Sequence, residues 1–463
     1  MNTQVEQVAR LVDELNIVAC IDHSGRGGNM FFLTIFDRHP EVISIPVMHY
    51  AYSYVGGFLN GRQTVSESEA YTYLTSKGYS RLLCQDPEGE AGELVERMGG
   101  PRYLKFPREE LRALIAQYCQ AKKSLNRREL ILLPYAAYAV VTGRDLDACK
   151  YALISDAISL RHENVLDGFS GVVIDQMVSD FPSARICNIV RDPRATFASP
   201  RHQFVNSLGN MYAIEPESYV ARFSQLLQRE FSPDNGAVYL YWLLYLSQTA
   251  RTIRRKKEEY PSHTATVRNE DLNLNFASTM RTVTDWIGVL MPEFYREEPF
   301  VPTVLGEPWQ GTGAYNNRYQ KNLTGPLQND SPKQSRVATG PNKYVTERWK
   351  TKLSLHEIRL IEGLFADELD DLGYPRSMMG RDKSTRTLMS LLAPMKGELP
   401  NLDWLRMGFK LDWSEFSRRL FYSCTFAPFS LVSRAILADL IFRKGFFTDA
   451  SPMPEHATRL GMP

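Results

Sequence analysis

A glycine-rich segment near the N-terminus constrains the fold of this chain more than any other feature. Residues 24–32, Ser-Gly-Arg-Gly-Gly-Asn-Met-Phe-Phe, follow an apolar run at residues 17–21 and open an apolar helical pattern that continues to Asp37. A strand, a glycine-rich turn and a helix start together present backbone amides that bind anions. Arg26 can add a fixed positive charge to a bound phosphate. The glycines that allow positive φ and a close approach are Gly25, Gly27 and Gly28. The segment therefore predicts a phosphate-binding loop.

This loop differs from the loop of the common ATPases. Those enzymes use Gly-x-x-x-x-Gly-Lys-Ser/Thr, in which the lysine contacts the phosphates and the hydroxyl binds magnesium. Here the corresponding stretch is Asn29-Met30-Phe31, which offers neither group. Glycine-rich turns between a strand and a helix also occur without a ligand, so a second site is needed to support the prediction.

A second segment provides that support. Residues 184–190 have the pattern of a short apolar strand and run directly into Arg191-Asp-Pro-Arg-Ala-Thr-Phe-Ala-Ser199. Pro193 fixes the turn, and a helix beginning beyond it would place Ser199 about two turns after Arg191. An arginine and a hydroxyl at this separation can bind one terminal phosphate. The alternative is a buried arginine that ties the strand end to a neighbouring carboxylate.

These segments together resemble the sulfotransferase family that uses 3′-phosphoadenosine 5′-phosphosulfate (PAPS). Residues 24–32 are similar to the family's 5′-phosphosulfate loop, and Arg191 with Ser199 match its 3′-phosphate motif. Residues 267–272 resemble its Arg-Tyr-Glu-Asp-Leu strand end, and residues 349–374 resemble the terminal helix of its carbohydrate-modifying branch. The matches occur in the expected order.

The resemblance implies a reaction and a cofactor site. The reaction would be in-line transfer of a sulfuryl group from PAPS to a hydroxyl or amine of an acceptor, a carbohydrate or glycolipid, without a covalent enzyme intermediate. Arg26 and the loop amides would stabilise the transferring group and the leaving phosphate, so we expect no metal. The implied cofactor-binding residues are Ser24, Gly25, Arg26, Gly27, Gly28, Asn29, Met30, Arg191 and Ser199.

The chain departs from the family pattern in two places. Asn29 and Met30 stand where the family usually has hydroxyl residues, so the Asn29 amide or backbone amides must replace those contacts. Residues 51–163 carry no motif of the family, and in the family this region shapes the acceptor pocket. Two alternatives stay open: a nucleotide-binding protein of the same fold that has lost transfer, and a related phosphoryl-transfer enzyme, against which the missing lysine counts.

The general base is predicted to be His49. Residues 42–47 have the pattern of the strand after the loop helix, which places His49 near the carboxyl end of a sheet, where ligands bind in open α/β folds. Imidazole titrates near neutrality, as a base at cellular pH should. The alternatives are a structural histidine at a strand end and three other side chains: His23, Glu163 and His202.

Short strand patterns alternate with longer helical patterns along the chain. The strands are predicted at residues 17–21, 42–47, 185–190 and 264–268, and the helices at residues 107–123, 127–141 and 233–258. Residues 307–341 are predicted to be a long loop. In the family such a segment often closes over the nucleotide, which implies that Arg336, or Lys343 just beyond the loop, reaches the 3′-phosphate; for either residue alone, a solvated basic loop is the stronger expectation. The alternation predicts an α/β fold with a parallel sheet covered by helices. The resemblance implies that this is the three-layer, P-loop-like fold of the sulfotransferases.

Composition excludes several classes of protein. The 54 basic residues against 53 acidic ones argue against a protein that coats nucleic acid. The six cysteines are scattered without metal-ligand spacing, which argues against structural zinc and a disulfide framework. The N-terminus lacks the pattern of a signal peptide, and no stretch is expected to span a bilayer. We therefore expect a cytoplasmic protein.

A helical C-terminal extension is predicted at residues 376–463, after a sulfotransferase domain at residues 1–375. Within it, residues 412–447 combine aromatic and aliphatic bulk with basic residues. This composition suits a helix pair broken at Pro428 that contacts a membrane surface peripherally. The stronger expectation is that these helices pack on the catalytic domain or on a second subunit, since apolar helical faces usually find protein.

Overall fold

The computed structural model describes most of the chain. It describes residues 3–22, 27–86, 92, 95, 100, 106–158, 169–198, 224, 227–228, 239–297, 299–311, 347–377, 391–395, 405 and 411–443. The predicted residues Ser24, Gly25, Arg26 and Ser199 lie outside this set, as do His23, Glu163, His202, Arg336 and Lys343.

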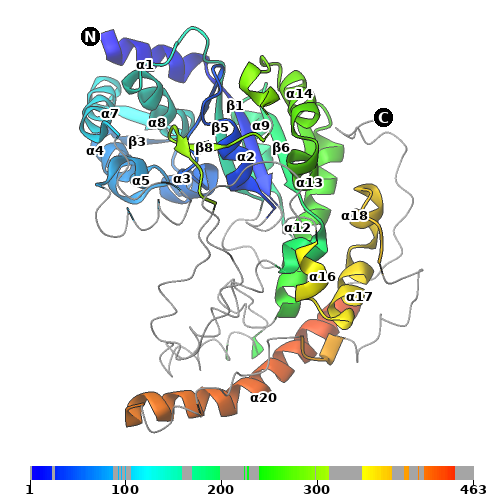
Figure 1. Ribbon diagram of the computed structural model, residues 1–463. Coiled ribbons are helices and arrows are strands. Elements are labelled where there is room, and N and C mark those ends of the chain that lie inside the picture. Colours follow the sequence, from blue (N-terminus) through cyan, green and yellow to red (C-terminus); the bar gives the residue numbers. More distant parts are fainter. Residues whose placement is uncertain are drawn as a thin grey trace.

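A parallel sheet of five strands forms the centre of the molecule (Figure 1). Its spatial order is β2-β5-β1-β6-β7. The strands are β1 (Asn16–Asp22), β2 (Val42–Ser44), β5 (Tyr151–Ala157), β6 (Arg185–Val190) and β7 (Thr264–Arg268). The predicted α/β fold is confirmed. The sequence analysis missed β5, which lies between β2 and β1, and it placed the end of β2 too late, because Ser44 is followed by a turn.

Helices cover both faces of this sheet. Neighbouring residues of a strand point to opposite faces of the sheet. In β1, the Cys20 thiol contacts Asn29 at the start of α2 (Asn29–Ile35). The next residue, Ile21, packs among residues of α9 (Val172–Asp180) and α12 (Tyr239–Glu259). Helix α2 therefore lies on the face opposite to α9 and α12. The three predicted layers follow from this arrangement.

The segment between β2 and β5 is mostly helical. It contains α3 (Ala51–Leu59), α4 (Glu67–Thr72), the π-helix η1 (Tyr73–Lys77), α5 (Arg81–Cys84), α7 (Arg108–Lys122) and α8 (Arg127–Val141). Two short strands that are distant in sequence, β3 (Thr64–Ser66) and β4 (Ser124–Asn126), pair in antiparallel orientation. The predicted helices at residues 107–123 and 127–141 are both confirmed. Helix α8 runs through Pro134 without interruption.

Shorter elements follow β7. They are α13 (Asn269–Leu274), α14 (Phe276–Ile287), the 3₁₀-helix η3 (Glu293–Arg296), a hairpin of β8 (Thr303–Val304) and β9 (Glu307–Pro308), α16 (Arg348–Lys352), α17 (Leu355–Leu364) and α18 (Ala366–Asp371). The predicted long loop at residues 307–341 thus begins with a strand, and its residues 312–341 lie outside the described set.

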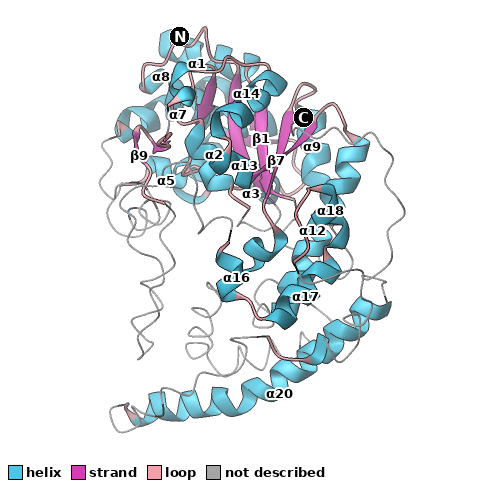
Figure 2. Ribbon diagram, turned by 45° about the vertical axis from the view of Figure 1, so that its right-hand side comes forward, coloured by secondary structure: helices cyan, strands magenta, loops and turns pink. Residues whose placement is uncertain are grey.

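Within the predicted C-terminal extension, residues 413–443 form one long helix, α20 (Trp413–Arg443), which corrects two expectations. The chain does not break at Pro428, because a helix can continue through a proline at the loss of one backbone hydrogen bond and with a local bend. Among the described residues, Arg419–Asp439 of this helix is also long and apolar enough to cross a membrane, by length and composition alone. In Figure 2 the helix lies apart from the sheet, near α17 and one end of α12.

Candidate functional site

The sheet order makes neighbours of the two strands that lead into the predicted phosphate motifs. Strand β1 pairs with β6 in a register that sets Asp22 beside Ile189, so the glycine-rich loop and Arg191 both leave the sheet at the same edge. The connection after β1 runs toward β5 and β2, whereas the connection after β6 runs toward β7. Ligands in open α/β sheets bind at the carboxyl ends of two strands whose connections diverge in this way.

Gly28 occupies a position that only glycine fits. Its φ is 123°, and a Cβ built on it would lie 1.9 Å from the Nδ2 atom of Asn269, at the start of α13. Asn269 is buried, and the Nδ2 atom of Asn273 donates to its carbonyl oxygen. The last turn of the loop is therefore packed against the end of β7, a contact that no pattern near Gly28 reveals.

The Asn29 side chain is bonded within the protein. Its Oδ1 atom accepts from the Cys20 thiol at 3.1 Å, and its Nδ2 atom lies 3.3 Å from the Ser155 hydroxyl oxygen at the end of β5. Asn29 thus holds the start of α2 against the strands β1 and β5. The contacts that it makes are structural ones, and the loop's backbone amides are left as the phosphate donors that its sequence predicts.

His49 joins this cluster from the turn before α3. Its Nδ1 atom lies 3.2 Å from the Ser155 hydroxyl, and its Nε2 atom lies 2.9 Å from the Pro46 carbonyl oxygen and 2.8 Å from the Met30 sulfur. A neutral ring with its proton on Nε2 satisfies the first two contacts. Removal of water from the ring lowers the pKa of His49 to about 4, against a smaller opposing effect of the Pro46 carbonyl.

Ser155 and Asp156 are site residues that the sequence analysis missed. The buried Asp156 carboxylate accepts hydrogen bonds from the Tyr52 amide at 2.6 Å and from the Ser53 hydroxyl at 2.5 Å, which fixes the start of α3. Burial raises its pKa to about 6, although these donors favour the charged form. The apolar run 152–154 was the available signal, because it marks a buried strand whose next residues are polar.

The other motif is anchored to α13 and to the chain beyond α18. Glu270 accepts from the Asp192 amide at 3.1 Å and from the Tyr374 hydroxyl at 2.6 Å, so it holds the turn that carries Arg191. Burial raises the pKa of Glu270, while the nearby charge of Arg191 lowers it. Arg191 therefore lies close to a buried carboxyl group.

Arg194, three residues later, ties the same turn to α17. Its guanidinium contacts both Asp192 oxygens and donates to Glu362 at 2.7 Å, and it lies 4.2 Å from the centre of the Trp349 ring. Arg194 is 1% exposed. A buried arginine that ties the end of the strand to carboxylates is thus present at Arg194, while Arg191 is half-buried and lies near the Glu270 carboxyl group.

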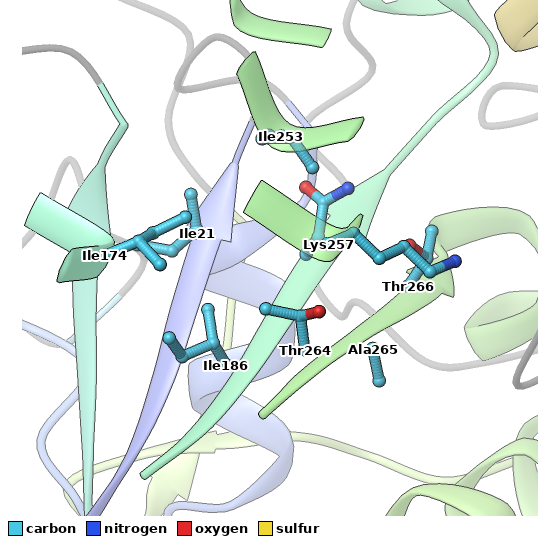
Figure 3. Close-up of a pocket in the computed structure, with 9 residues that line it drawn as sticks. Ile21, Ile174, Ile186, Ile253, Lys257, Thr264, Ala265 and Thr266 are labelled. Atoms are coloured by element: carbon cyan, nitrogen blue, oxygen red, sulfur yellow. The ribbon is translucent and has the colours of Figure 1, made fainter. Parts of the chain in front are cut away.

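A cavity beneath this edge is too small for a nucleotide. It lies between the sheet and the helices α9 and α12, lined by Ile21, Ile174, Ile186, Ile253, Lys257 and Thr266 (Figure 3). Its free volume of about 10 Å³ leaves room for about one water molecule. Over the described ranges, no group of three or more His, Cys, Asp or Glu side chains is arranged to hold a metal.

Comparison with known proteins finds similarity only at the level of distant solved structures. No family model matches the chain, and no curated protein matches it. A solved structure described as "Sulfotransferase Domain from the Curacin Biosynthetic Pathway" aligns with 79% of this chain and 100% of its own, at 12% identity and a TM-score of 0.38. Similarity at this level carries no information on cofactor or substrate.

Proposed function

We propose that this chain is a sulfotransferase that moves a sulfuryl group from PAPS to a hydroxyl or amine of an acceptor. The observation that supports the proposal is the register of β1 and β6, which sets Asp22, before the glycine-rich segment, beside Ile189, before the turn of Arg191. Two phosphate-binding segments at one sheet edge suit a nucleotide with phosphates at both ends.

The described residues are compatible with such a ligand. Gly27 and Gly28 carry no side chain between the loop backbone and a phosphate, and Gly28 begins α2 without a side-chain cap. Residues 24–30 would hold the 5′ end, and Arg191 with Ser199 the 3′-phosphate. PAPS supplies the sulfuryl group when bound. The protein's tasks are to orient the acceptor, to remove its proton and to offset the charge that develops on the leaving phosphate.

Arg191→Ala is expected to weaken binding of 3′-phosphoadenosine 5′-phosphate by about 10- to 100-fold, because a hydrogen bond to a charged group contributes about 1.5–3 kcal/mol. Ser199→Ala should have a smaller effect, since a hydroxyl makes a weaker bond. Isothermal titration with this nucleotide and with adenosine 5′-phosphate measures the preference for a 3′-phosphate, which should shrink in Arg191→Ala.

Arg185→Ala is the matched control for that experiment. Arg185 lies on the same strand at the opposite end, where its guanidinium donates to the Ser262 carbonyl oxygen. Its variant should bind both nucleotides as the wild type does. The 3′-phosphate assignment is wrong if folded Arg191→Ala keeps the full preference.

His49 is the proposed base, and its pKa of about 4 sets the expected pH profile. A base works deprotonated, so transfer should stay constant near neutrality and fall only as the pH drops through about 4. His49→Gln should lower the rate by 10²-fold or more and remove this acidic limb. Near-normal transfer with the same limb, at an unchanged melting temperature, would assign His49 to positioning and move the search to Glu163.

A nucleotide-binding protein without transfer activity is the second candidate. The observation that favours it is that Asn29 and both ring nitrogens of His49 have partners inside the protein. Tight binding of 3′-phosphoadenosine 5′-phosphate with no sulfated product from any acceptor would select it.

The acceptor proposed from the family resemblance is a saccharide or glycolipid. Mass spectrometry of cell glycans and lipids, with and without the protein, tests this proposal, because a mass shift of one sulfate that depends on the protein names the product. A shift found only in other metabolites would remove the saccharide assignment and keep the transfer reaction.

A further inference from the structure

Helix α20 carries an exposed apolar stripe along one side. Trp413 is 79% exposed, Leu420 44% and Leu431 59%. Cys424 and Ala435 are exposed on the same side. These positions are separated by seven, four, seven and four residues, which is the period of one helical face. The stripe therefore extends over about six turns of the helix.

Two arginines of this helix are buried against the protein. Arg419 is 3% exposed and Arg434 is 1% exposed, and Arg434 donates to the Leu391 carbonyl oxygen at 2.8 Å. Between these two arginines the sequence contains no charged residue. Burial lowers the pKa of Arg434 to about 10, which leaves it charged at neutral pH.

The last turns of the helix anchor it to the body of the protein. Leu437, Ala438 and Ile441 are fully buried and join the hydrophobic core, and α20 contacts α12. Only 29% of the apolar window is buried inside the protein. The earlier turns thus present their apolar side outward from a helix that is fixed at its other end.

We propose that this stripe contacts the apolar region of a lipid bilayer. Residues 420–433 carry no charge on any side of the helix for almost four turns, as expected of a helix that contacts lipid. A helix that pairs with a second copy in water ordinarily has charged residues beside its apolar seam. Arg419–Asp439 measures about 30 Å at 1.5 Å per residue, the dimension of a bilayer core. Trp413 stands at the outer end of the stripe, a residue type enriched at the membrane interface.

Flotation of the full chain with phosphatidylcholine vesicles tests the proposal. The wild type should float with these neutral vesicles at 0.15 M and at 1 M NaCl, because salt screens charges but does not weaken apolar burial. Leu420→Asp with Leu431→Asp should lower the bound fraction at least tenfold. Leu355→Asp is the control, since Leu355 is 59% exposed at the first position of α17, where an acidic residue is tolerated.

Several outcomes would overturn the proposal. The first is that the wild type stays in the soluble fraction. The second is that binding needs anionic phosphatidylserine and is lost in 1 M NaCl, and the third is that the double variant floats as well as Leu355→Asp. Light scattering can give a fourth such outcome. A dimer that the double substitution converts to a monomer, without vesicle binding, would assign the stripe to a second copy of the chain. Because the readout is vesicle binding, its failure leaves the proposed transfer reaction untouched.

Discussion

Arg26→Ala is expected to lower the maximal rate of sulfuryl transfer by on the order of 10²-fold or more. Arg26 is the charged residue of the glycine-rich loop, and positive charge at the leaving phosphate stabilises the transition state more than the ground state. Affinity for 3′-phosphoadenosine 5′-phosphate should change less than the rate. Single-turnover kinetics with PAPS, beside titration of the product nucleotide, separates the two effects.

Arg38→Ala provides the control for Arg26. Arg38 lies just beyond the end of α2 and stacks over the Phe294 ring at 5.1 Å, away from the loop backbone. Its replacement should leave the transfer rate unchanged. An Arg26 variant that binds nucleotide more weakly but turns over at the normal maximal rate would contradict the role in transfer and assign Arg26 to binding.

Gly28→Ala is expected to lower the free energy of unfolding by about 1–3 kcal/mol through its backbone conformation alone, with an added cost from the contact with Asn269. The added methyl would meet the buried Asn269 amide at 1.9 Å, so α13 or the loop must shift. Urea denaturation measures the stability, and titration with 3′-phosphoadenosine 5′-phosphate should show weaker binding, because the loop amides move with Gly28.

Gly61→Ala separates strain from crowding. Gly61 also has a positive φ, 83°, but a Cβ there would meet nothing within 4 Å. Gly61→Ala should therefore lose only the part of the unfolding free energy that comes from the backbone conformation. Adding Asn269→Ala to Gly28→Ala should recover part of the extra stability that Gly28→Ala loses relative to Gly61→Ala, as expected for two contacting residues in a double-mutant cycle. Equal losses for Gly28→Ala and Gly61→Ala would show that Asn269 adjusts freely.

Features encoded in neighbouring residues were readable from the sequence. The run at residues 17–21, the glycine turn after it and the apolar pattern beyond predicted β1, the loop and α2, because strand and helix periods of 2 and 3.6 residues are local properties. The strand before Arg191 and the helix α7 followed from the same patterns. Ser24, Gly25, Arg26 and Ser199 stay predictions from sequence.

Contacts between distant segments were decided by the tertiary structure. Strand β5 enters between β2 and β1, which brings Ser155 to Asn29 and His49 across more than a hundred residues. The buried pair of Arg194 and Glu362 joins positions 168 residues apart. Such pairings depend on the order of the strands in the sheet and on which buried polar side chains need a hydrogen-bond partner. The spacing of residues along the chain specifies neither the strand order nor these partners.

The C-terminal helix illustrates the same division. The sequence alone determined that this segment is rich in apolar and basic residues, because composition does not depend on how the chain folds. Whether Pro428 ends the helix depends on whether the packing of the helical turns before and after it outweighs the loss of one backbone hydrogen bond. In the structure, the buried turns at Leu437 and Ile441 belong to the same continuous helix as Trp413. The sequence alone determined the local elements, and tertiary packing decided how they meet and which faces they leave exposed.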